Sequence, residues 1–299
     1  MHRGIVDFLK MNDVEYKEGL SLARISPINI GPKAFAVVYP DSPEKLTCLI
    51  TFLNKSKIKH KILGRMSNVL FLDGYYDGIV IRTDRLNAFS INQNMVTASC
   101  GTALPYLCNI LCKAGLSGFE GLSGIPGSIG GAILGNAGAF GYEIGERVLS
   151  VECYDIEKGE IITLLADNIR FSYRHSSFKN NGLVILSARF LFSQSDEFAV
   201  RNEMERCRKS RFLSQPIDKP SLGSTFKGSK EGIPASKLID DCGLKGYSVG
   251  GAQISTKHAG FIINRGDATT KDYVDLSDYA ADRVYEKYKI RLEREIEII

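Results

Sequence analysis

The sequence lacks the patterns that mark the commoner kinds of site. Its seven cysteines include no C-x-x-C pair and are unevenly spaced. An odd, scattered set argues against a disulfide framework and against a zinc site, so we expect reduced thiols and no metal. No Lys/Arg-rich block interleaved with aromatic residues occurs, and a net charge of +4 is too weak to indicate nucleic-acid binding. That charge is compatible with an anionic small molecule as the ligand.

A secreted or membrane location is not indicated either. Asp7 and Lys10 interrupt the apolar positions that a signal peptide needs near the N-terminus. The uncharged stretch Gly121–Tyr142 has 22 residues, enough to cross a bilayer, but eight glycines, Pro126 and Asn136 dilute its apolar content. We therefore expect a cytoplasmic protein with no membrane contact. The oligomeric state stays open, with a monomer slightly favoured.

Length and composition fit a globular protein of two domains. The chain has 299 residues, of which 44% are hydrophobic and 24% are charged. Apolar residues recur at helical and at strand spacing in alternation, which predicts an α+β fold. Two prolines in Gln215–Pro220 indicate a linker, and we place the domains at residues 1–200 and 201–299.

Local signals set the bounds of the expected elements. Ser42 and Pro43 begin a helix that runs to about Lys55, and Gly115 ends a helix that begins near Leu104. Further helices are expected at about 197–211, from Pro234, and at 270–288. Strands are expected at Phe35–Tyr39, Lys61–Leu63, Gly78–Arg82, Val148–Tyr154, Glu160–Leu164, Val184–Phe192, Gly260–Asn264 and Leu292–Ile299. In the last strand one face would carry Glu293, Glu295 and Glu297.

Gly124–Gly141 is the most informative segment, with seven glycines in 18 residues. Each glycine costs backbone entropy in a helix or strand, so this density predicts neither. It suits a backbone that approaches a large ligand closely, with its N–H groups directed at negative charge. A purely structural turn region is the alternative that this segment alone leaves open.

A second loop, Gly64–Asn68, follows a short strand and carries two side chains, Ser67 and Asn68, that are suited to bind pyrophosphate oxygens. Neither G-x-x-x-x-G-K-[ST] nor a well-placed G-x-G-x-x-G occurs, so neither a P-loop nor a Rossmann site is indicated. Together the two loops predict a dinucleotide bound by a non-Rossmann α+β domain.

Several motifs, in order along the chain, resemble those of the UDP-N-acetylenolpyruvoylglucosamine reductase family. The resemblance runs from about residue 25 to the C-terminus. It rests on Gly124–Gly141, Tyr173–Phe178, Gln215–Pro216, Gly223–Lys227, Ala235–Gly246, Gly250–Asn264 and Leu292–Ile296. The short segment after Ser172 is similar to the more compact of the family's two types.

The resemblance implies a fold and an activity. The fold would be an FAD-binding domain of the PCMH, or vanillyl-alcohol-oxidase, type, followed by a smaller α+β substrate-binding domain. The activity would be the NADPH-dependent reduction of UDP-N-acetylglucosamine enolpyruvate to UDP-N-acetylmuramate, with non-covalent FAD as cofactor. That reaction belongs to peptidoglycan precursor synthesis in the cytoplasm, and through it to cell wall biogenesis, cell shape, the cell cycle and cell division.

The family's functional positions carry over to single residues of this chain. The catalytic positions are matched by Arg174, Ser224 and Glu295. Arg174 would hold the substrate carboxylate and the charge that develops there, Ser224 would donate the proton, and Glu295 would orient the arginine or share a proton with the enolate. Substrate would be bound by Arg174, Lys227, Lys257 and His258. FAD would be bound by Gly64, Ser67, Asn68, Gly124, Ile125, Pro126, Gly127, Ser128, Gly130, Gly131, Asn136 and Ala137.

Three places differ from the family pattern. Near the N-terminus, Asn29–Ala34 is a shortened version of the expected I-G-G-P-A. Met66 replaces the middle glycine of the first loop, and we expect its side chain to crowd the pyrophosphate. Gly228 and Ser229 follow Lys227 where the family has Asn-Pro, which removes one expected substrate contact.

Two other interpretations of the function stay open. One is a flavin-dependent oxidoreductase of the same fold with another substrate, and the other is a non-catalytic nucleotide-binding relative.

Overall fold

The computed structural model describes residues 2–229 and 232–299. The chain forms two compact units, each assembled from three stretches of sequence. The first unit comprises Met1–Glu18, Ala36–Arg65 and Asp77–Lys209, and the second comprises Gly19–Phe35, Met66–Tyr76 and Ser210–Ile299. Within the described parts of the chain, no helix combines the length and the apolar content needed to cross a membrane.

The N-terminal part of the chain forms a four-stranded sheet in the order β1-β2-β5-β3. Its strands are β1 (Glu15–Glu18), β2 (Lys33–Tyr39), β5 (Tyr75–Arg82) and β3 (His60–Leu63). Helix α2 (Pro43–Lys55) begins as predicted, because the Ser42 hydroxyl accepts a hydrogen bond of 3.2 Å from the backbone N–H of Lys45. The helix buries a single apolar face made of Leu46, Leu49, Ile50 and Leu53.

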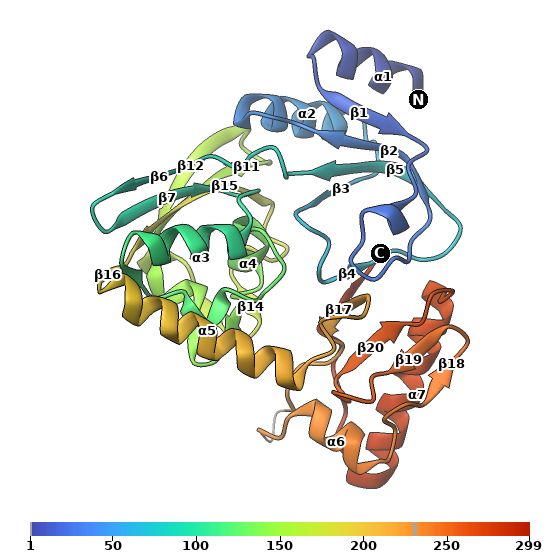
Figure 1. Cartoon of the computed structure of the whole chain (residues 1–299). Helices are drawn as coiled ribbons and strands as arrows, with labels where there is room; N and C mark the ends of the chain where they lie inside the picture. Colours follow the sequence, from blue (N-terminus) through green and yellow to red (C-terminus); the bar gives the residue numbers. More distant parts are fainter. Residues whose placement is uncertain (1, 230–231) are drawn as a thin grey trace. The chain divides into compact units, whose positions relative to one another are not determined.

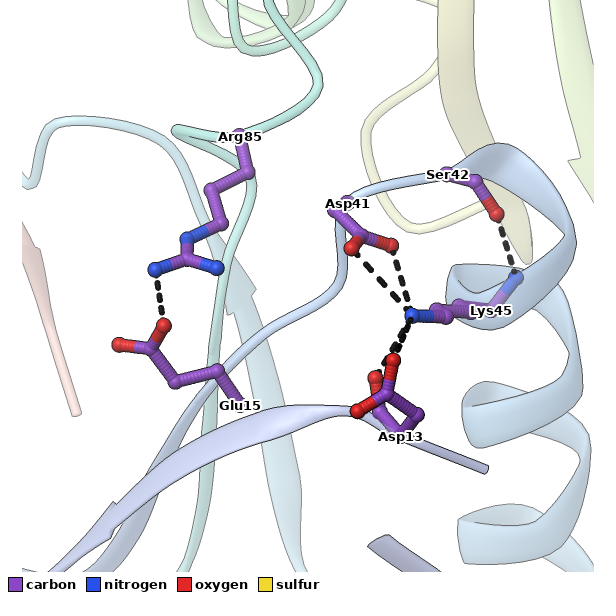
Figure 2. Close-up of polar contacts among 6 residues, drawn as sticks. All are labelled: Asp13, Glu15, Asp41, Ser42, Lys45 and Arg85. Atoms are coloured by element: carbon purple, nitrogen blue, oxygen red, sulfur yellow. Dashed lines mark hydrogen bonds and ion pairs between the residues drawn. The ribbon is translucent and has the colours of Figure 1, made fainter. Parts of the chain in front are cut away.

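The first helix and strand were not predicted from the sequence. Helix α1 (His2–Met11) buries Ile5 and Leu9, and Phe8 stacks on Phe52 of α2 at 4.1 Å between ring centroids. Polar contacts fix the turn that follows (Figure 2). Lys45 donates to the backbone carbonyl of Asp13 at 2.6 Å and lies 3.2 Å from the carboxylate of Asp41. These contacts, with the ion pair between Arg85 and Glu15, hold β1 on the edge of the sheet.

A five-stranded antiparallel sheet, in the order β12-β11-β15-β7-β6, forms the rest of the first core. Its strands are β12 (Glu160–Leu165), β11 (Val148–Asp155), β15 (Leu183–Leu191), β7 (Met95–Ser99) and β6 (Phe89–Asn92). Helices α3 (Leu104–Lys113) and α4 (Ile129–Leu134) lie on one side of it (Figure 1). Phe119 packs edge-on against Phe190 and Phe192 there, with centroids 5.4 and 4.8 Å away.

Shorter elements complete this unit. Three strand pairs are β8 (Leu116–Ser117) with β16 (Ser193–Gln194), β9 (Gly138–Ala139) with β10 (Tyr142–Glu143), and β13 (Phe171–Ser172) with β14 (His175–Ser176). The long helix α5 (Glu197–Ser214) follows β16 and begins and ends close to the predicted bounds.

The second unit contains an antiparallel sheet in the order β17-β20-β19-β18. Its strands are β17 (Ser221–Ser224), β20 (Phe261–Asn264), β19 (Ala252–Ile254) and β18 (Ser248–Val249). Helices α6 (Ala235–Asp241) and α7 (Thr270–Tyr288) share one hydrophobic core with this sheet. Its largest fully buried side chain is that of Tyr273, on α7.

The segment 66–76, far away in sequence, is built into this second unit. Its strand β4 (Val69–Leu70) pairs in parallel with β21 (Glu297–Ile298). The Asp73 carboxylate accepts the backbone N–H groups of Thr270 and Lys271, at 3.0 and 2.8 Å, and so caps α7 together with Thr269. The segment therefore supplies both a strand and a helix cap.

The prediction of a single C-terminal strand over Leu292–Ile299 is wrong. Only Glu297–Ile298 is a strand, and Arg294 forms an isolated bridge with Phe226. The reason is a change of partner: Glu295 donates its backbone N–H to Thr225, whereas Glu297 donates its own to Asn68. One continuous ladder, with all three glutamates on a shared face, therefore does not form.

Candidate active site

The glycine-rich segment Gly124–Gly141 contains a helix, contrary to the sequence prediction. Gly130 and Gly131 lie within α4. A Cβ added to Gly130 would come within 2.9 Å of the Cβ of Cys100, so a larger residue would push the helix away from β7. Here the absence of a side chain allows close packing of a short helix.

Ser128, directly before α4, has the features expected of a ligand-binding group. Its side chain is 2% exposed, and within the described residues its hydroxyl has no hydrogen-bond partner. A Cβ added to Gly64 would lie 2.2 Å from this hydroxyl. The structure thus brings Gly64 of the first predicted loop into close contact with Ser128 of the second, with no room for a side chain at position 64. A buried hydroxyl without a partner is costly, and a phosphate oxygen would satisfy it.

Asn136 is 1% exposed, and its side-chain amide is engaged within the protein. Its Nδ2 donates to the Glu143 carboxylate at 2.7 Å and to the carbonyl of Ser172 at 3.1 Å. Its Oδ1 accepts the N–H of Gly145 at 3.1 Å. The predicted contact of Asn136 with FAD would therefore have to come from its backbone.

Arg174 lies in the two-residue turn between β13 and β14, where Ser172 pairs with His175. Its φ of 55° is left-handed, a conformation that is strained for arginine. The guanidinium donates to the carbonyl of Gly138 at 3.0 Å, and the Tyr173 ring lies 5.2 Å from its central carbon. The structure thus brings Arg174 to the end of the glycine-rich segment.

Ser224 ends β17 after a break in the strand register between Ser221 and Ser224. Gly223 has a φ of 80° at this break, and among the described residues no atom beyond its chain neighbours lies within 4 Å of an added Cβ. Glycine suits this backbone conformation, and the irregularity lies directly before Ser224. The next residue, Thr225, is anchored by a 3.0 Å contact between its hydroxyl and the buried Tyr273 hydroxyl.

Glu295 is brought close to Ser224 along the backbone, because its N–H donates to the carbonyl of Thr225 at 2.9 Å. Its neighbour Arg294 donates to the Ser277 hydroxyl at 2.9 Å and pairs with Asp278 on α7. The Glu295 side chain is half-buried, whereas Glu293 and Glu297 are exposed. The three carboxylates thus have different surroundings.

The predicted substrate-binding residues of the second unit have partners of several kinds. Lys227 forms an ion pair with Glu293. Lys257 donates to the carbonyl of Phe212 and lies 5.0 Å from the centre of the Phe212 ring. The Nδ1 of His258 accepts the N–H of Gly260 at 3.2 Å, so the proton of the neutral ring is on Nε2. Burial and the nearby Lys245 hold the pKa of His258 below its usual value.

The predicted first phosphate loop is divided between the units, with Gly64 in the first and Ser67 and Asn68 in the second. Met66 has a φ of 56° and a side chain that is only 3% exposed. The backbone thus keeps a conformation typical of glycine, and the side chain is buried in protein. This burial argues against the expected crowding of a ligand by Met66.

Two profiles of known families match the chain. That of an FAD binding domain matches residues 34–165, and that of the UDP-N-acetylenolpyruvoylglucosamine reductase C-terminal domain matches residues 215–299. A UDP-N-acetylenolpyruvoylglucosamine reductase of Streptococcus pneumoniae (strain JJA) is 40% identical over 296 residues, which cover 99% of this chain and 97% of that protein. The chain belongs to the UDP-N-acetylenolpyruvoylglucosamine reductase family.

A crystal structure from this reductase family agrees with the fold. The reductase of Thermus caldophilus is 30% identical, with a TM-score of 0.80, and the match covers 95% of this chain and 98% of that one. A berberine bridge enzyme variant, 16% identical with a TM-score of 0.50, shares the fold over 66% of this chain and 44% of its own. The predicted fold class, an FAD-binding domain followed by a reductase C-terminal domain, is confirmed.

The matched ranges include most of the predicted site. The FAD-binding range contains every predicted cofactor residue, and the C-terminal range contains Ser224, Lys227, Lys257, His258 and Glu295. Arg174 lies between the two ranges. The roles of the individual residues stay predictions. Sequence reasoning missed Lys179, which donates to the carbonyl of Arg174, and Glu143, which accepts from Asn136, because no local pattern marks a hydrogen-bond partner of this kind.

Proposed function

We propose that this protein catalyses the NADPH-dependent reduction of UDP-N-acetylglucosamine enolpyruvate to UDP-N-acetylmuramate. The observation that carries the proposal is the 40% identity to a reductase of this name over 99% of the chain. The site adds support, because Ser224 and Glu295, far apart in sequence, are joined through the backbone of Thr225. The reaction would supply peptidoglycan precursors in the cytoplasm, and cell shape and division would depend on it.

The residues of the first unit fit an FAD pyrophosphate. The buried Ser128 hydroxyl, which has no hydrogen-bond partner in the described part of the chain, is suited to a phosphate oxygen. Backbone groups of Gly124–Gly131 would line the same ligand. When bound, FAD supplies a hydride carrier between NADPH and the enolpyruvyl group. No group of three or more His, Cys, Asp or Glu side chains suited to a metal occurs among the described residues.

Arg174 would bind the substrate carboxylate. A guanidinium offers two parallel N–H donors to a carboxylate, and its fixed charge stabilises the negative charge that builds there as the enolate forms. One donor already contacts Gly138, which orients the planar group. Arg174 would thus act by charge and orientation.

Ser224 would donate the proton that completes the reduced product, and Glu295 would support this transfer. A serine hydroxyl is a poor acid in water, so the transfer requires a neighbour that stabilises or reprotonates the alkoxide. Glu295, a half-buried residue whose backbone is hydrogen-bonded to Thr225, is the candidate for this task. Lys227 is engaged with Glu293, and we do not assign the task to it.

Two measurements test the proposal. The purified protein should show a flavin spectrum, and heat or acid should release free FAD. NADPH oxidation should then depend on UDP-N-acetylglucosamine enolpyruvate, with UDP-N-acetylmuramate as the product. A flavoprotein that oxidises NADPH only with another acceptor would favour a different substrate on the same fold. A colourless protein that takes up no added FAD would overturn the assignment.

A further inference from the structure

The backbone at Arg174 requires support from outside its own turn. An arginine at φ 55° in a two-residue turn persists only where the surroundings hold it there. On either side of the turn, the carbonyl of Ser172 accepts from Asn136 at 3.1 Å, and the Ser176 hydroxyl donates to Leu134 at 2.9 Å. The hairpin is therefore attached to the chain that leaves α4.

Asn136 can make its contact with Ser172 only in one orientation. Because Oδ1 accepts the N–H of Gly145, Nδ2 must point the other way, toward Ser172 and Glu143. The 2.7 Å bond to the Glu143 carboxylate is charge-assisted, so it is the strongest of the three. Glu143 thus fixes the amide that holds the hairpin.

Glu143 also supports the other contact of Arg174. In the β9–β10 pair Glu143 lies directly opposite Gly138, whose carbonyl accepts from the Arg174 guanidinium. The Glu143 Cγ lies 3.0 Å from where a Cβ on Gly138 would be, so its side chain packs against the residue that carries this acceptor. Through Asn136, Glu143 also holds the carbonyl two positions before Arg174.

We propose that Glu143 is a positioning residue for Arg174, which it supports through the side chain of Asn136 and by packing against Gly138. This inference rests on the proposed function, in which Arg174 binds the substrate carboxylate. It assigns the side chain of Asn136 to the same support and gives it no contact with the cofactor.

The test compares Glu143→Ala, Glu143→Asp and Glu143→Gln with the control Glu146→Gln, which removes an exposed carboxylate three residues away. In the FAD-loaded enzyme, Ala and Asp should slow flavin reoxidation by the enolpyruvyl substrate roughly ten- to a hundred-fold, as small misplacements of a binding group do. Gln keeps an oxygen acceptor for Asn136 and should stay within about three-fold of wild type. Flavin reduction by NADPH should stay unchanged in all four variants.

The same substitutions in an Arg174→Ala background decide whether Glu143 acts through Arg174. Glu143→Ala should then cause no further loss, because the group that it positions is gone. The proposal would be overturned if Glu143→Ala slowed flavin reoxidation equally in the wild-type and the Arg174→Ala backgrounds. It would also be overturned if Glu143→Gln were as slow as Glu143→Ala. If Glu143→Ala does not fold, Glu143→Asp and Glu143→Gln can be compared in the same two backgrounds. If the wild-type protein does not turn over the enolpyruvyl substrate, the proposed function fails instead.

Discussion

The side-chain amide of Asn68 donates a hydrogen bond of 2.9 Å to the backbone carbonyl of Glu295. The carbonyl of Asn68 in turn accepts the N–H of Glu297 at 3.0 Å. Asn68 therefore holds the backbone on both sides of Ile296, next to the proposed catalytic carboxylate. The sequence predicts an FAD contact for this residue, whereas the structure shows a structural role for its side chain.

Asn68→Ala should lower the free energy of unfolding by about 0.5–1.5 kcal/mol, the usual net contribution of one such bond. It should slow flavin reoxidation by substrate more than it weakens FAD binding, because the freed segment carries Glu295. Asn94→Ala is a matched control, since Asn94 makes a similar 3.1 Å bond to the carbonyl of Phe192. Stopped-flow absorbance and FAD titration measure the two effects. If Asn68→Ala bound FAD more weakly but was reoxidised at the normal rate, the result would support a direct contact between the Asn68 side chain and FAD.

Met66→Gly should destabilise the protein without tightening FAD binding. Removing a buried methionine side chain costs about 2–5 kcal/mol, and relief of the left-handed backbone returns only about 1–2 kcal/mol. Met66→Leu keeps the buried volume and should cost less than about 1.5 kcal/mol. Thermal unfolding and FAD titration check both variants. Tighter FAD binding in Met66→Gly would support crowding by the methionine.

Glu295→Gln should reduce turnover by about 10²-fold or more, the range of a positioned acid or base. Glu293→Gln and Glu297→Gln should stay within about three-fold of wild type, because both side chains are exposed. Steady-state kinetics of the three variants at one pH make the comparison. Equal losses in all three would indicate a general electrostatic effect.

Ser224→Ala should separate the two half-reactions. Flavin reduction by NADPH needs no proton from Ser224 and should keep its wild-type rate. Reoxidation by the enolpyruvyl substrate should slow by about 10²–10⁴-fold, with little change in substrate binding. Stopped-flow spectroscopy follows both phases. Wild-type reoxidation would exclude Ser224 as the donor, and a defect in the first phase would point to a structural role.

His258 should make stability fall as the pH is lowered. Its pKa is below the usual value because of burial and Lys245, so the unfolded chain binds its proton first as the pH falls below about 6.5. Stability is then lost progressively until the folded-state pKa is passed. His258→Asn keeps an acceptor for Gly260 but does not titrate, and its melting temperature should fall less between about pH 7 and pH 5. If the melting temperatures of the wild type and of His258→Asn fell equally between these pH values, the result would contradict this account.

The sequence by itself determined the elements whose signals are local. Helix α2 begins where Ser42 and Pro43 predict, and α7 spans the predicted 270–288. Caps and apolar spacing act within one or two turns, so a short window of sequence contains them. The family motifs around Arg174, Ser224 and Glu295 are equally local, and the family that they indicate is confirmed.

Only the tertiary structure decided which distant segments join. The sequence around Asn68 and Asp73 contains nothing that indicates a place beside the C-terminus, yet hydrogen bonds to Glu295 and to α7 fix that segment in the second unit. The C-terminal strand ends early for the same reason, since its backbone changes partners from Thr225 to Asn68. The helix in the glycine-rich segment depends on close packing against Cys100. Backbone hydrogen bonds must be satisfied and cores must be filled, and the partners that achieve this can lie anywhere along the chain.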